Sequence, residues 1–172
     1  AMAYPFLKAK GHNIGKSLCS DEDVSLARLI LTGTKAAKLK LPVDHVVSTS
    51  PNENAEIVNG RDVPENKMGL DIGPKTVNQF KECLVGAKTV LWNGPMGFFE
   101  KENFSKGTFA IANALAELNA FTLVGGGDSV SAIKKSGISD KISHISTGGG
   151  ASLEFIESGT LPCIQALKFG IE

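Results

Sequence analysis

Apolar and polar residues recur along this chain with two different periods, which predict helices in some segments and strands in others. In SDEDVSLARLILTGTKAAKL, Val24, Ala27 and Leu31 recur at helical spacing, and Ser20 followed by Asp23 resembles a capping box. Further helices are predicted in AMAYPFLKAK, TVNQFKECL, NFSKGTFAIANALAEL, DSVSAIKKSG, GGASLEFIESG and LPCIQAL. Gly residues are expected to close the DSVSAIKKSG and GGASLEFIESG helices.

Short apolar runs predict the strands, which are HVVSTS, AEIVNG, KMGLDIGP, KTVLWNG, FTLVG and ISHIST. From residue 88 onward strands and helices alternate, an order typical of a parallel sheet with helices on both faces. The predicted fold class is therefore α/β, a three-layer αβα sandwich around a mainly parallel, Rossmann-like sheet. The segment PNENAEIVNGRDVPENK is polar and rich in turn residues, so we expect surface loops around a short strand.

Three glycine-containing turns, NGPMGFFE, GGGDS and GGGAS, follow the last three predicted strands. Because loops after parallel strands lie together at the carboxyl edge of the sheet, the three turns are expected to converge. Glycines let backbone N–H groups approach a ligand, and the helix start behind them adds unpaired donors, so such turns bind anions, most often phosphate. Alternatively, the glycines serve only tight turns and close packing. The repeated triplet favours the anion site.

Composition narrows the class of protein. The 172 residues are 42% hydrophobic and 21% charged, and 18 basic residues balance 18 acidic ones. These values are typical of a single globular domain and argue against nucleic acid as the main partner. No apolar run is long enough to span a membrane. The three cysteines, Cys19, Cys83 and Cys163, are scattered, which argues against a disulfide scaffold or zinc site and fits a reducing cytoplasm.

Several single residues allow two interpretations. GHNIGKS resembles a phosphate-binding loop, but its spacing is one residue short and no strand precedes it, so Lys16 and Ser17 are interpreted as a surface turn. Asp128, the one acid inside a glycine turn, is either a helix N-cap or a ligand of Mg²⁺ beside substrate phosphates. Glu100 is either a surface charge or a partner of a ribose. His144 is interpreted as a core histidine.

Four blocks are longer than single motifs: KMGLDIGPKT, LWNGPMGFFE, GGGDS and SHISTGGGASLEF. In this order and spacing they resemble the C-terminal domain of the phosphoglycerate kinase family, and the resemblance runs from AYPFLK through LPVDHVV to the last helix. It implies a glycolytic, cytoplasmic and monomeric enzyme that transfers a phosphoryl group between 1,3-bisphosphoglycerate and ADP with Mg²⁺. Residues 1–172 would be its nucleotide-binding domain. The first strands and the phosphoglycerate-binding N-terminal domain would lie upstream, so this chain alone is expected to be inactive.

The resemblance also implies roles for individual positions. The adenine pocket would be lined by Leu18, Met68, Gly69, Leu70, Gly97 and Phe98. Glu100 would meet the ribose. The nucleotide phosphates would be faced by Asn93, Gly94, Pro95, Gly126, Gly127, Asp128 and Ser129, with Asp128 on the magnesium. The backbone amides of Gly127 and Gly150 would point at the phosphoryl group in transfer, Gly127 from the nucleotide side and Gly150 from the phosphoglycerate side.

Three positions depart from the family pattern. Lys67 stands where family members commonly have Trp, Pro5 replaces a Thr, and no aromatic residue lies near Thr49–Pro51. None of these is a phosphate-binding position, so any effect should fall on adenine affinity. Two other functions remain open from the residues: a nucleotide-binding module without catalysis, and a dehydrogenase-type dinucleotide domain. The absence of GxGxxG argues against the second of these.

Overall fold

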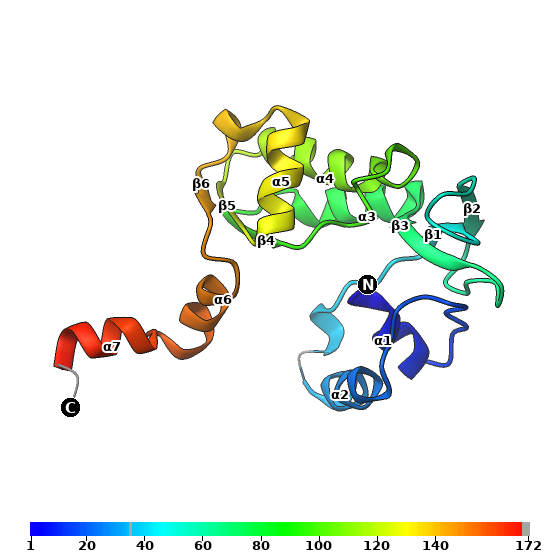
Figure 1. Ribbon diagram of the computed structural model, residues 1–172, viewed down its shortest axis with the longest axis horizontal. Coiled ribbons are helices and arrows are strands. Elements are labelled where there is room, and N and C mark those ends of the chain that lie inside the picture. The colour runs from blue at the N-terminus through cyan, green and yellow to red at the C-terminus, as the bar shows by residue number, and fades with distance from the viewer. Residues whose placement is uncertain (35, 170–172) are drawn as a thin grey trace.

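A computed structural model describes residues 1–34 and 36–169 and confirms an α/β fold (Figure 1). The helices are α1 Ala3–Ala9, α2 Asp21–Thr32, α3 Pro74–Leu84, α4 Lys106–Ala116, α5 Gly127–Ser136, α6 Gly149–Ser158 and α7 Pro162–Phe169. The strands are β1 Asp44–Ser48, β2 Glu56–Asn59, β3 Met68–Ile72, β4 Thr89–Asn93, β5 Phe121–Gly125 and β6 His144–Ser146. Short 3₁₀ turns cover Ala36–Lys38, Glu102–Phe104 and Ser139–Lys141.

The first three strands form an antiparallel sheet in the order β2-β1-β3. His45 of β1 lies opposite Val58 of β2 and Ile72 of β3. The sequence predicts these strands but not their separate sheet. Hydrophobic alternation shows which side of a strand is buried, whereas it does not show which strand pairs with which.

The last three strands form the predicted parallel sheet, in the order β4-β5-β6. Each strand is joined to the next by a crossover that contains a helix, α4 between β4 and β5 and α5 between β5 and β6. The strands end in register, because Asn93 pairs with Gly125 and Gly125 pairs with Ser146. Their carboxyl ends therefore lie side by side at one edge.

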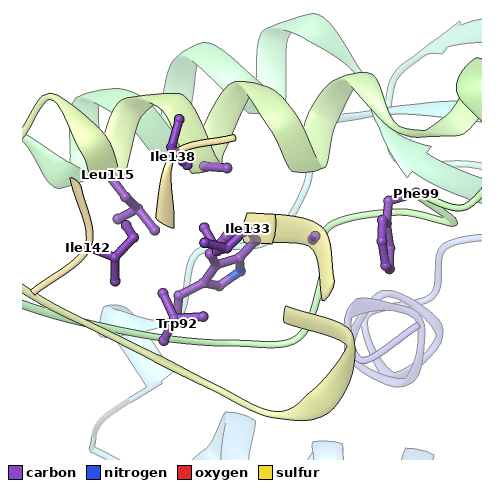
Figure 2. Packing of buried hydrophobic residues seen from close by; sticks show 9 residues of the cluster. Trp92, Phe99, Leu115, Ile133, Ile138 and Ile142 are labelled. Carbon is purple, nitrogen blue, oxygen red and sulfur yellow. The ribbon is translucent and has the colours of Figure 1, made fainter. Parts of the chain in front are cut away.

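The main core lies between one face of the parallel sheet and the helices α3, α4 and α5. Trp92 and Val124 project from the sheet into this core, where Leu115 of α4 and Ile133 of α5 meet them. Trp92, Ile133, Leu115 and Ile142 belong to one buried cluster, and Figure 2 shows Trp92 next to Ile133. Alternate residues of β4 and β5 point to this side, as the two-residue period of a strand requires.

The other face of the parallel sheet is open in the described part of the chain. Leu91 is 40% exposed and Phe121 is 53% exposed, and both lie on this face together with His144, which pairs with Leu123. His144 is exposed, so its interpretation as a core histidine is wrong: its strand was predicted to be buried, but its side chain points to the open face. Within the described residues, β4 also has no strand on its outer side.

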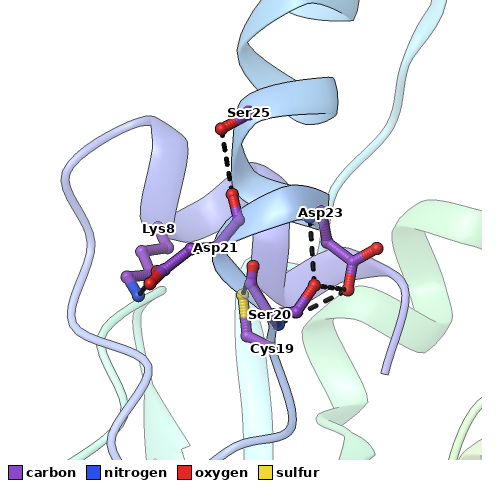
Figure 3. Close-up of polar contacts among 6 residues, drawn as sticks. All are labelled: Lys8, Cys19, Ser20, Asp21, Asp23 and Ser25. Carbon is purple, nitrogen blue, oxygen red and sulfur yellow. Dashed lines mark hydrogen bonds and ion pairs between the residues drawn. The ribbon is translucent and has the colours of Figure 1, made fainter.

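Helix ends follow the local sequence closely. Ser20 and Asp23 form the predicted capping box at the start of α2, where the Ser20 hydroxyl accepts the Asp23 amide at 3.1 Å (Figure 3). Lys8 of α1 pairs with Asp21 at 3.2 Å, which ties the two N-terminal helices together. At the other end of the chain, Gly137 and Gly159 close α5 and α6 in left-handed conformation, as predicted.

A second, smaller core joins α1 to the antiparallel sheet. Its buried members are Tyr4, Leu7, Ile14, Val47 and Val63. By contrast, β6 leads out to α6 and α7, which run away from the sheets in Figure 1 and have several exposed apolar side chains. None of the helices in the described ranges is both long and apolar enough to cross a membrane.

Candidate functional site

The three glycine-containing turns converge at the carboxyl edge of the parallel sheet, as predicted. The Gly94 amide donates to the Ser129 hydroxyl at 2.6 Å, which joins the turn after β4 to the first turn of α5. A Cβ built on Gly126 would lie 3.4 Å from Asn93 Oδ1, and one built on Gly149 would lie 3.6 Å from Gly126 Cα. The first triplet therefore lies between the Asn93 turn and the second triplet.

Two helices begin at this edge without a side-chain cap. Gly126 is the N-cap of α5 and Gly148 is the N-cap of α6, and neither helix start has a capping side-chain hydrogen bond in the described residues. The amides of the first turn of a helix have no intrahelical acceptor, and the positive end of the helix dipole lies among them. Two such helix starts side by side make a binding site for an anion.

The glycines of the two triplets differ in what they require. Gly126 has φ +91°, and Gly94 in the neighbouring turn has φ +103°, which are conformations that only glycine adopts readily. Gly127 and Gly150 lie inside the first turns of their helices, and a Cβ on either would meet nothing within 4 Å. Both of these positions are exposed, so their backbone amides are open to a ligand.

Asp128 is exposed in the first turn of α5 and does not act as the N-cap, which is Gly126. The interpretation of Asp128 as a helix cap is therefore wrong for this structure. Among the described residues, no three His, Cys, Asp or Glu side chains gather in a cluster that could hold a metal ion. A single exposed carboxylate can still contribute to Mg²⁺ binding, since Mg²⁺ uses one or two carboxylates together with phosphates and water.

The residues assigned to the adenine pocket come from three segments that hydrogen bonds hold together. The Phe98 amide donates to the Leu70 carbonyl at 2.7 Å, which links the turn after β4 to β3. The Gly69 amide donates to the Ser17 hydroxyl at 3.0 Å, which brings the neighbouring Leu18 to the same strand. Leu18 and Phe98 are both exposed, at 81% and 38%. Met68, Gly69, Leu70 and Gly97 are half-buried, and Glu100 is exposed in the turn beyond Phe98.

The GHNIGKS segment is a turn and not a phosphate-binding loop. Lys16 is exposed, its amide donates to the Lys67 carbonyl at 2.8 Å, and the next helix begins only at Asp21. Gly15 is packed against the Lys67 and Pro64 carbonyls so closely that a Cβ there would overlap them. The Lys67 ammonium forms an ion pair with Glu56 of β2. Lys67, one of the departures from the family pattern, is thus paired with the antiparallel sheet.

A buried carboxylate lies behind the turn that carries Phe98. Asp71 of β3 is 3% exposed, and its Oδ2 accepts the Gly107 amide at 2.7 Å. Burial raises the pKa of Asp71 to about 7, although the amides of Gly107 and Ile72 lower it in part. Tyr4 lies close by, and burial raises its pKa to about 12. An acid within an apolar strand was visible in KMGLDIGP, but its partners on α4 were not.

Comparisons with known proteins agree on one family. Residues 1–159 match the family described as "Phosphoglycerate kinase". The chain is 59% identical over 171 residues to a phosphoglycerate kinase of Lactobacillus delbrueckii subsp. lactis, covering 97% of this chain and 42% of the relative. It is 54% identical over 172 residues to one of Anaeromyxobacter dehalogenans (strain 2CP-C), covering 98% of this chain and 43% of the relative.

Solved structures give the same result. Phosphoglycerate kinase from Coxiella burnetii superposes with a TM-score of 0.88 at 42% identity, covering 97% of this chain and 44% of that one. The enzyme from Pyrococcus horikoshii OT3 superposes with a TM-score of 0.82 at 35% identity, covering 98% and 43%. The chain thus spans less than half the length of the relatives that it matches.

Proposed function

This chain belongs to the phosphoglycerate kinase family, and we propose that its 172 residues are the nucleotide-binding half of such an enzyme. The complete protein would transfer a phosphoryl group reversibly between 1,3-bisphosphoglycerate and ADP. The phosphoglycerate site would lie in the part of the protein outside these residues, an N-terminal domain in the order that the resemblance implies. Cytoplasmic location and a monomeric state remain predictions from the sequence.

One observation carries the proposal: the starts of α5 and α6 meet at the edge where β4, β5 and β6 end in register. Phosphate groups bear negative charge and accept hydrogen bonds, which is what uncapped helix starts offer. We assign the amides of Gly126 and Gly127 to the phosphates of the nucleotide, with the Asn93–Pro95 turn beside them and Ser129 holding that turn in place. The amide of Gly150 is assigned to the phosphoryl group as it passes from the phosphoglycerate side.

The base and ribose would lie next to the phosphates, over the hydrogen-bonded β3 segment and the Phe98 turn. Leu18, Leu70 and Phe98 offer apolar surface to an adenine ring, and Met68, Gly69 and Gly97 complete that side. Glu100, exposed beyond Phe98, is assigned to the ribose hydroxyls, because its carboxylate can accept hydrogen bonds from them. The Phe98–Leu70 backbone hydrogen bond supports this assignment because it fixes two of the apolar residues to each other.

Phosphoryl transfer needs alignment and stabilisation of charge more than covalent help from the protein. Gly127 and Gly150 can provide both, since their amides are fixed by helix geometry and carry no side chain that could hinder the approach of a ligand. Asp128 would hold Mg²⁺ together with the nucleotide phosphates, and the ion, when bound, would neutralise part of the phosphate charge. The remaining charge would be stabilised by backbone amides from both triplets.

The test uses the full-length protein and, beside it, the 172-residue chain. Calorimetric titration should show binding of Mg·ADP and Mg·ATP by the full-length protein and none of NAD at the same concentrations. A coupled assay should show ADP-dependent phosphoryl transfer by the full-length protein, whereas the 172-residue chain should show none. Binding without transfer by the full-length protein would favour a nucleotide-binding module, and a preference for NAD would contradict the proposal.

A further inference from the structure

Two buried side chains that have no part in the proposed site, Asp71 and Thr108, lie behind the turn that ends in Phe98. The carboxylate of Asp71 accepts two hydrogen bonds from backbone amides, one on each oxygen. The donors are Ile72 at 2.8 Å and Gly107 at 2.7 Å. Gly107 is the second residue of α4, so Asp71 caps this helix from a distant strand. None of the ion pairs found in the described residues involves Asp71, so the polar partners of its carboxyl group are these two amides.

Thr108, the third residue of α4, holds the turn directly. Its hydroxyl oxygen accepts the amides of Met96 and Gly97, each at 3.1 Å, and its side chain is fully buried. Gly97 is packed so closely on Asp71 that a Cβ there would overlap the carboxylate. The Phe98 amide donates to the Leu70 carbonyl. Three consecutive amides of the turn, those of Met96, Gly97 and Phe98, are therefore held by hydrogen bonds to buried groups.

The same arrangement occurs a second time, at α3. Thr76 is the third residue of α3, and its hydroxyl oxygen accepts the amides of Val43 and Asp44 at 3.0 and 3.1 Å. The Asp44 carboxylate accepts the Lys75 and Thr76 amides at 2.9 and 2.7 Å. This second pair joins α3 to β1 and contacts none of the residues assigned to the nucleotide. It is therefore a matched control within the same chain.

We propose that Asp71 and Thr108 are positioning residues for the base side of the nucleotide site, an inference that rests on the proposed function. Neither side chain can reach a ligand, since Asp71 is 3% exposed and Thr108 is 0% exposed. Their effect is to hold the backbone of Gly97 and Phe98 in position. The two triplets depend on other supports, such as the Ser146–Ser152 hydrogen bond at 2.7 Å behind the second one. Loss of the Asp71–Thr108 pair should therefore weaken nucleotide binding without slowing transfer.

The first experiment compares Asp71→Asn with Asp44→Asn in the full-length protein. Asparagine replaces one accepting oxygen with an NH₂ group, which leaves one of the two amides without a partner. Asp71→Asn should raise KM for Mg·ADP about tenfold and change kcat less than about twofold, because binding lost equally in ground and transition states raises KM alone. Asp44→Asn should leave both constants within about twofold at a temperature where both variants are folded.

The second experiment guards against a variant that does not fold. Thr108→Val removes the hydroxyl acceptor at nearly constant volume, Thr108→Ser keeps it, and Thr76→Val is the matched control. Thr108→Val should raise KM for Mg·ADP with kcat nearly unchanged, and Thr108→Ser should restore the wild-type KM. A fall in kcat equal to the rise in KM, an equal effect of the Asp44 and Thr76 variants, or no effect of the Asp71 and Thr108 variants would overturn the inference. If the wild type shows no ADP-dependent transfer, the proposed function itself fails.

Discussion

The Ser129 hydroxyl accepts the Gly94 amide at 2.6 Å, and this one contact joins the turn after β4 to the helix start after β5. Ser129 is fully buried, and its side chain holds two parts of the candidate site together at the start of α5. Ser129 was predicted to lie at the nucleotide phosphates. The structure adds a supporting role for its hydroxyl at the same place.

Replacing Ser129 with alanine should therefore loosen the site. The Gly94 amide would lose its partner, and an unpaired, partly buried amide costs about 1 kcal/mol or more of stability. We expect a lower urea midpoint and weaker binding of Mg·ADP for Ser129→Ala. Ser131→Ala, on the exposed side of the same helix, is the control and should change neither measurement. Equal behaviour of the two variants would show that the Ser129 contact is dispensable.

Gly127→Ala and Gly150→Ala should separate the roles of the two triplets. Gly126 is unsuitable for this comparison, since its φ of +91° would strain any other residue. At Gly127 and Gly150 a methyl group meets nothing within 4 Å, and alanine in a helix is favoured over glycine. Both variants should thus melt at or slightly above the wild-type temperature.

A methyl group at Gly127 should crowd the nucleotide phosphates and raise the Kd of Mg·ADP. A methyl group at Gly150 should leave this Kd nearly unchanged and lower kcat, by about 10²–10³-fold if the amide acts like an oxyanion-hole donor. The measurement is Kd by calorimetry and kcat by the coupled assay for both variants of the full-length protein. A folded Gly150→Ala variant with wild-type kcat would reduce the second triplet to a structural turn.

Asp128→Asn should weaken the binding of Mg·ATP much more than the binding of metal-free ADP. The reason is that a magnesium ligand is lost, while the helix keeps its stability because Asp128 makes no capping hydrogen bond. The melting temperature should therefore change little, in line with surface substitutions elsewhere. The measurement is calorimetric titration of the variant with both ligands. Asp140→Asn, at another exposed position, is the control for the loss of one charge. Equal losses for both ligands would contradict a metal-binding role.

Asp71 should make stability depend on pH. Its pKa is raised by burial from 3.8 to about 7, so the folded state keeps a proton that the unfolded state has released. The stability that Asp71 contributes is therefore complete below about pH 4 and declines as pH rises to about 7. Urea unfolding of the wild type and of Asp71→Asn, measured from pH 4 to pH 8, should show a difference that shrinks with rising pH. Parallel curves would mean that Asp71 does not titrate in this range.

Local sequence signals were enough to predict most elements and to bring the turns of the candidate site to one edge. The capping box at Ser20, the closing glycines Gly137 and Gly159, and the convergence of the three turns all follow from short-range rules and from the parallel order of the strands. The Gly107 partner of Asp71 and the partners of Thr108 could not be predicted, because they come from segments more than ten residues away that only packing brings together. The prediction for His144 was wrong for a related reason: the sequence of a strand does not show which of its faces another layer covers.

The open face of the parallel sheet also affects how this chain would behave in concentrated solution. Leu91 of β4 and Phe121 of β5 lie exposed on this face, and the outer edge of β4 has no neighbouring strand in the described residues to pair its backbone donors and acceptors. An apolar, unpaired edge of this kind is a template on which another copy can add a strand. The isolated 172-residue chain should therefore tend to self-associate and aggregate, and sedimentation at increasing concentration would show the growing species. A charged residue at Leu91 would be the simplest way to keep it soluble.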